Sequence, residues 1–118
     1  MAVHLELGKR GEELAAAWLL KNGFAILYRN WRHSHYEIDI IAVKDDMVHF
    51  IEVKFRSSDK FCHPEENVTK KKFKCLLNAA DEFLYQHIRF KDFRIDVLSI
   101  TDRKNDEPEY FFIEDVYL

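Results

Sequence analysis

Three charged side chains interrupt two apolar segments near the middle of the chain. Segments 37–43 and 48–55 are nearly continuous apolar runs, apart from Glu37 at the start of the first and Asp39 within it, and His49, Glu52 and Lys54 in the second. Runs of this kind are typical of strands that are buried on both faces. Acids and a lysine placed there are expensive to bury unless they have partners, so they are the first candidates for chemistry.

The hairpin predicted for these segments brings the charges together. The connection 44–47 contains two adjacent aspartates, which favour a tight turn. A hairpin centred between them pairs residues whose numbers sum to 91. That register sets Asp39 opposite Glu52 and Glu37 opposite Lys54 on one face of the hairpin.

Two opposed carboxylates require a compensating cation, because like charges about 5 Å apart destabilise a sheet, and more so where water is scarce. Mg²⁺ binds one or two carboxylates and otherwise keeps water and phosphate oxygens, so Asp39 and Glu52 predict a magnesium or manganese site. Lys54 would lie roughly 6 to 7 Å further along the strand, where it could polarise a water or a phosphate. The alternative is a structural ion-pair cluster without metal.

A fourth candidate lies in the predicted helix over residues 4–22. Glu12 falls at the edge of the apolar stripe, from which a carboxylate could point toward the sheet. The alternative is a boundary residue favoured only by its charge in the first half of the helix. Gly8 and Gly11 suit close packing of helix on sheet, and Gly23 supplies a C-terminal stop.

Basic residues follow the candidate site along the chain. Residues 54–74 contain seven basic residues against three acids, although the whole chain carries a net charge of -3. Lys70, Lys71 and Lys72 open the second predicted helix, where they oppose the positive end of its dipole. Such a start favours an anionic partner, and phosphate binding beside a metal is the functional interpretation. A solvated lysine face is the alternative.

The remaining elements complete an α/β chain. A strand is expected over 24–31, followed by a polar loop 32–35; Thr69 resembles an N-cap, with Val68 stapled onto Phe73, for a helix that continues to about residue 88. Two further strands are expected over 93–100 and 110–116. The order αβββαββ predicts one domain over residues 1–118, with a central mixed sheet flanked by helices.

Composition excludes several other classes of function. With 118 residues and 47% apolar content the chain can form a core without disulfides, and its 3 glycines include no phosphate-binding fingerprint. The charged start has no signal-peptide pattern and no apolar stretch could cross a bilayer, so we expect a cytoplasmic protein with reduced thiols. Cys62, His63, Cys75 and His87 are too loosely spaced to favour zinc, and no serine triad is recognisable.

The motifs in order resemble the PD-(D/E)xK nuclease superfamily, which has a restriction-endonuclease-like core. More closely, the chain resembles the YraN-like family of predicted endonucleases, distant relatives of archaeal Holliday junction resolvases. The resemblance runs from about residue 7 to residue 100. Its motifs are Gly8-Lys9-Arg10-Gly11-Glu12 with Ala15, Asn30-Trp31-Arg32, the run from Glu37 to Ala42, Glu52-Val53-Lys54 with Arg56, and Val68-Thr69 followed by Lys72. The chain departs from the family pattern at Tyr36, Ile38, Phe55 and Cys62-His63.

The resemblance implies a Mg²⁺-dependent or Mn²⁺-dependent endonuclease that acts on DNA, by analogy on branched DNA. Asp39, Glu52 and the Val53 carbonyl would hold the ion, Lys54 would activate water, and Glu12 would position water or a second ion. Phosphate contacts would come from a basic group: Arg56, Lys70, Lys71 and Lys72. A homodimer is a further expectation, and no membrane partner is expected. The competing interpretation is a non-catalytic DNA-binding or protein-interaction domain that keeps the nuclease fold.

Overall fold

The computed structural model describes residues 2–57, 70–103 and 106–116. Its elements confirm the predicted order αβββαββ. They are α1 (Ala2–Lys21), β1 (Ala25–His33), β2 (Tyr36–Lys44), β3 (Met47–Ser57), α2 (Lys70–Gln86), β4 (Phe93–Asp102) and β5 (Glu109–Ile113). The expected N-cap at Thr69 and staple from Val68 lie outside the described residues.

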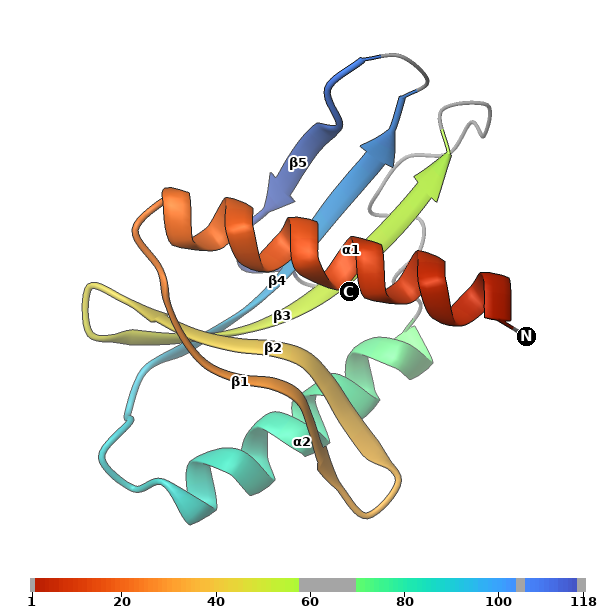
Figure 1. The fold of residues 1–118 in the computed structure, drawn as a ribbon. Coiled ribbons are helices and arrows are strands. Elements are labelled where there is room, and N and C mark those ends of the chain that lie inside the picture. Colours follow the sequence, from red (N-terminus) through yellow and green to blue (C-terminus); the bar gives the residue numbers. More distant parts are fainter. Residues whose placement is uncertain (1, 58–69, 104–105, 117–118) are drawn as a thin grey trace.

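The five strands form one mixed sheet in the order β1-β2-β3-β4-β5 (Figure 1). The pair β3 and β4 is parallel, and the other three pairs are antiparallel. Parallel neighbours need a crossover, which α2 supplies between β3 and β4. The α/β class and the mixed sheet are thus as predicted.

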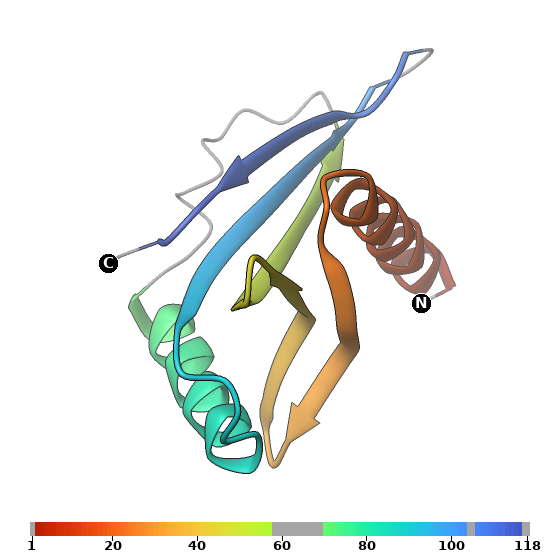
Figure 2. The ribbon, with the colours of Figure 1, turned by 90° about the vertical axis from the view of Figure 1, so that its left-hand side faces the viewer.

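The helices cover opposite faces of the sheet (Figure 2). On one face, α2 packs a buried stripe of Leu76, Ala79, Ala80 and Phe83 against residues of β2 and β3 that include Phe50. On the other face, α1 packs against a second cluster; its members include Ala15, Leu19, Ile40, Ala42, Ile51, Leu98 and Ile100. Because both faces are covered, the central strands are buried on two sides. Neither described helix has the length and apolarity to cross a membrane.

Glycines fix how α1 ends and how closely it packs. Gly23 has a φ of +90°, and the N–H groups of Gly23 and Phe24 donate to the carbonyls of Leu20 and Leu19, which closes the helix as a Schellman motif. A Cβ at Gly11 would lie 2.8 Å from the Cβ of Phe55 on β3. The predicted roles of Gly23 as a stop and Gly11 in close packing are confirmed.

The β2–β3 hairpin has the predicted register. Its paired residues sum to 91, from Lys44 with Met47 to Ile40 with Ile51. Asp45 and Asp46 both have positive φ, at 54° and 63°, as a two-residue hairpin turn of type I′ requires.

Several element boundaries differ from the prediction; the last strand, for example, is expected to continue to residue 116 but ends at Ile113. The predicted loop 32–35 is shorter in the structure: only residues 34–35 form the turn, because Arg32 and His33 extend β1 by pairing with Glu37 and Tyr36. Ser34 has a φ of 58°, and the β1–β2 hairpin is closed by the two-residue turn 34–35. The second helix ends at Gln86 instead of continuing to about residue 88, and the side chain of Ile88 is 83% exposed.

Candidate active site

The strands β2 and β3 separate at Asp39. Their backbone pairing extends only to Ile40 and Ile51. Ile38 packs in the α2-side cluster and Ile40 in the α1-side cluster, so the regular alternation of β2 is interrupted between them. In place of a ladder bond, the backbone N–H of Val53 donates to Oδ2 of Asp39 at 2.8 Å. This separation turns the Asp39 side chain toward β3.

The carboxyl groups of Asp39 and Glu52 lie within hydrogen-bonding distance of each other. The pKa of Asp39 is raised from 3.8 to about 7, first by burial and then by the negative charge of Glu52 and the side-chain hydrogen bond to it. The Val53 N–H and the Lys72 ammonium act in the opposite direction. Near neutral pH Asp39 is therefore only partly ionised, and the predicted juxtaposition of Asp39 and Glu52 is confirmed.

Two lysines contact the second acid. Lys54 Nζ and Lys72 Nζ each lie 3.3 Å from Oε2 of Glu52, whose side chain is only 5% exposed. The predicted proximity of Lys54 to the acids is confirmed, but Glu37 is not its partner. Glu37 is exposed and pairs with Arg32 at 3.3 Å, because the β2–β3 ladder ends before reaching it.

The donor set fits a hard divalent cation better than zinc. Asp39 and Glu52 present carboxylate oxygens, and a raised pKa is the expected sign of two acids held together without a sufficient counter-charge. Mg²⁺ needs one or two carboxylates and takes its other ligands from water and phosphate. Among the described residues no three His, Cys, Asp or Glu side chains form a group that could hold a metal.

Glu12 lies apart from these acids in its contacts. Its carboxylate accepts a hydrogen bond from Asn30 Nδ2 and lies 3.9 Å from Arg29 Nε, both on β1. Arg29 also pairs with Glu13 at 2.6 Å. Glu12 therefore points toward the sheet edge at β1, and its participation beside Asp39 stays a prediction.

The basic residues divide between the site and the surface. Lys70 and Lys71 are exposed at the start of α2, whereas Lys72 reaches Glu52. Arg56 is half-buried in β3, two residues beyond Lys54 on the same strand. The phosphate contacts of the three lysines stay a prediction, and Lys72 is in addition an ion-pair partner of Glu52.

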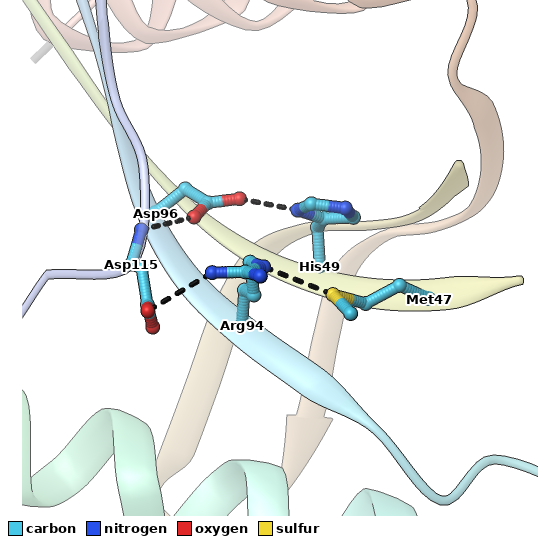
Figure 3. Close-up of polar contacts among 5 residues, drawn as sticks. All are labelled: Met47, His49, Arg94, Asp96 and Asp115. Carbon is cyan, nitrogen blue, oxygen red and sulfur yellow. Dashed lines mark hydrogen bonds and ion pairs between the residues drawn. The ribbon is translucent and has the colours of Figure 1, made fainter. Parts of the chain in front are cut away.

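A second buried polar cluster escaped the sequence analysis (Figure 3). His49 Nδ1 lies 2.6 Å from Oδ2 of Asp96, and these residues are 6% and 0% exposed. Asp115 N–H donates to Oδ1 of Asp96 at 2.8 Å, and Arg94 Nη1 donates to Oδ2 of Asp115 at 2.9 Å. Arg94 Nε also lies 3.0 Å from Met47 Sδ. The signal in the sequence was a polar residue in each of two apolar runs: His49 in 48–55 and Asp96 in 93–100.

Comparison with known proteins identifies relatives along the whole chain. The profile of the uncharacterised protein family UPF0102 matches residues 11–100. A UPF0102 protein of Chloroherpeton thalassium is 41% identical over 99% of this chain and 97% of its own length. One from Bacteroides thetaiotaomicron is 45% identical over 82% of this chain and 75% of its own. These matches confirm the expected YraN-like family.

Among solved structures, the chain is similar to Hjc of Archaeoglobus fulgidus, described as a Holliday junction resolvase. The TM-score is 0.49 with 17% sequence identity, over 87% of this chain and 74% of that one.

Proposed function

This chain belongs to the uncharacterised protein family UPF0102, and we propose that it is a metal-dependent endonuclease that hydrolyses phosphodiester bonds in DNA. The observation that carries the proposal is the contact between the Asp39 and Glu52 carboxyl groups at the point where β2 and β3 separate. A fold gains nothing from two acids held together at a buried position, so their placement favours a ligand that supplies positive charge.

The proposal gives each site residue a role. Asp39, Glu52 and the Val53 carbonyl would hold Mg²⁺ or Mn²⁺, which would polarise the phosphoryl oxygen and lower the pKa of an attacking water. Lys54 would orient that water and stabilise the charge that develops on the phosphate. Glu12, held by Asn30, would position water.

Binding of DNA would use the basic residues around the acids. Lys70 and Lys71 are exposed at the start of α2, whose first turn also carries Lys72 beside Glu52. Arg56 extends the positive charge along β3. The motif resemblance to resolvases makes branched DNA the first substrate to examine. A homodimer stays a prediction. It is tested by measuring the molecular mass of the DNA-free protein in solution.

The proposal is tested by incubating the protein with linear, flap and four-way DNA in Mg²⁺, Mn²⁺ or EDTA. We expect cleavage with either metal, none in EDTA, and at least 10²-fold slower cleavage by Asp39→Asn. Glu37→Gln is the matched control, because Glu37 is an exposed acid of the same strand and should be dispensable. The proposal would be contradicted if the folded wild type cleaved none of these substrates in the presence of metal.

A second candidate is a DNA-binding domain without catalysis. The contacts of Lys54 and Lys72 with Glu52 support it, because two ammonium groups balance the charge of the acids without a metal. Metal binding separates the candidates. The enzyme predicts that Mg²⁺ or Mn²⁺ raises Tm in the wild type but not in Asp39→Asn, with about 1.4 kcal/mol of stabilisation at ten times the Kd.

A further inference from the structure

Glu52 has two cationic partners that compete for one atom. The ammonium groups of Lys54 and Lys72 each lie 3.3 Å from Oε2 of Glu52. A metal ion held by Glu52 would require a carboxylate oxygen at closer range than either ammonium. The positions of the two lysines therefore bear directly on access of a metal to this acid.

The two lysines are attached to the fold in different ways. Lys54 is two residues from Glu52 on the same strand, with its side chain 24% exposed. Lys72 comes from the first turn of α2, and its side chain is 43% exposed. A lysine stem is flexible and its ammonium is readily rehydrated, so the more exposed Lys72 is the partner that can leave Glu52.

With both acids ionised, as binding of a metal requires, the four side chains of this group carry no net charge. Two carboxylates, Asp39 and Glu52, face two ammonium groups, Lys54 and Lys72. A divalent cation added to this group leaves an excess of two positive charges at short range, where Coulomb repulsion is strong. Movement of one ammonium away from Glu52 removes half of that excess, and a DNA phosphate offers the displaced ammonium a new anionic partner.

We propose that Lys72 is an internal counter-ion of the metal-free site, which competes with the divalent metal for Glu52 and moves to a DNA phosphate when the metal binds. This inference rests on the metal site of the proposed function. It makes Lys72 a positioning residue that couples the two ligands: metal releases the lysine for DNA, and by reciprocity DNA favours metal.

The competition is measured as Mn²⁺ affinity of the DNA-free protein by isothermal titration calorimetry. Lys72→Met keeps the apolar stem and removes the charge, so we expect it to bind Mn²⁺ about fivefold more tightly than the wild type. Lys72→Arg keeps the charge and should bind as the wild type does. Lys74→Met, which changes an exposed lysine of the same helix, is the matched control and should leave the affinity unchanged. Lys72→Gln provides a second neutral variant if Lys72→Met does not fold.

The coupling is measured as DNA affinity with Ca²⁺ or with EDTA. In Ca²⁺, Lys72→Met should weaken DNA binding and reduce the salt slope by about one unit, whereas in EDTA it should have little effect because the lysine is held by Glu52. Tighter Mn²⁺ binding by Lys72→Met, or binding by it alone, supports the proposal. Equal or weaker Mn²⁺ binding by Lys72→Met than by the wild type overturns the role of Lys72 and leaves the metal site intact. Absence of binding by both proteins overturns the metal site and this inference together.

Discussion

Asp96 on β4 and Asp39 on β2 are acids of the same sheet, with β3 between their strands, but their carboxyl groups have different partners. Asp96 is fully buried, and its two oxygens are matched by His49 Nδ1 and the Asp115 N–H. Asp39 receives one backbone donor, from Val53, and faces a second acid, Glu52. The second arrangement raises the pKa of Asp39 to about 7.

The comparison teaches that burial alone does not identify a functional acid. A buried carboxylate with a donor on each oxygen contributes to the fold, and its network ties β3, β4 and the chain after β5 together (Figure 3). A buried carboxylate that faces another acid, as Asp39 faces Glu52, is costly to ionise, and a cationic ligand can offset that cost. We therefore expect mutations at the two clusters to affect different properties, stability at Asp96 and metal-dependent chemistry at Asp39.

The largest expected effect is the loss of stability when His49 is replaced. His49→Leu removes one donor and leaves the Asp96 carboxylate buried with only the Asp115 N–H, which should cost about 3 to 5 kcal/mol of unfolding free energy. Urea denaturation measures the loss. The double variant His49→Leu, Asp96→Asn should recover part of it, because the unpaired charge is then absent. Wild-type stability of His49→Leu would show that the two clusters do not differ as described.

The second prediction concerns Lys54, the lysine next to the unmatched acids. Lys54→Ala should reduce DNA cleavage by about 10²-fold or more, which corresponds to the loss of a positioned electrostatic stabiliser. Lys44→Ala is the control, because it removes a lysine near the His49–Asp96 cluster and should leave cleavage unchanged. Lys44 lies over the Phe24 ring, and that ring packs edge-on against His49. Cleavage rates and Tm are measured on the same preparations. Global unfolding of Lys54→Ala would instead assign this lysine to a structural ion pair with Glu52.

The fold was predictable wherever local chemistry decides it. The two aspartates at 45 and 46 accept the positive φ that a tight hairpin needs, and so they set the register that approaches Asp39 and Glu52. Ser34 supplies a positive φ with a residue that carries no strong turn signal, so the extension of β1 through His33 could not be read from the chain.

The candidate site was predictable only within the hairpin. Glu52 and Lys54 share a strand face by simple alternation. Lys72 was assigned to phosphate alone, because the position of α2 over β3 depends on packing by residues such as Phe83 and Phe50. The pairing of His49 with Asp96 requires a parallel β3–β4 register across 47 residues, which no local pattern encodes.

The third prediction is a difference in the pH dependence of stability without metal. Folded protein retains the Asp39 proton to about pH 7, whereas the unfolded chain releases it near pH 3.8, so wild-type stability should fall as the pH rises between these values. Asp39→Asn keeps an acceptor for the Val53 N–H and adds a donor toward Glu52. It should therefore flatten the profile and exceed the wild type by on the order of 2 kcal/mol at pH 8. Parallel profiles for the two proteins, measured by urea denaturation, would contradict the raised pKa.

The smallest expected effect is on DNA affinity, which should depend on a lysine near Asp39 and Glu52 but not on one near the His49–Asp96 cluster. Lys71 is exposed in the first turn of α2, the turn that also carries Lys72 to Glu52, so a phosphate bound at the acids would pass near it. Lys71→Ala should weaken DNA binding to a similar extent for all sequences and reduce the slope of log affinity against log salt by about one unit, since one fewer counterion is released. Lys44→Ala, beside the His49 cluster, removes the same charge elsewhere and should leave the slope unchanged. Fluorescence anisotropy over a range of salt concentrations measures both slopes. Equal changes for the two variants would mean that DNA binding follows overall charge, whereas a change confined to Lys71→Ala would locate the DNA beside Asp39 and Glu52.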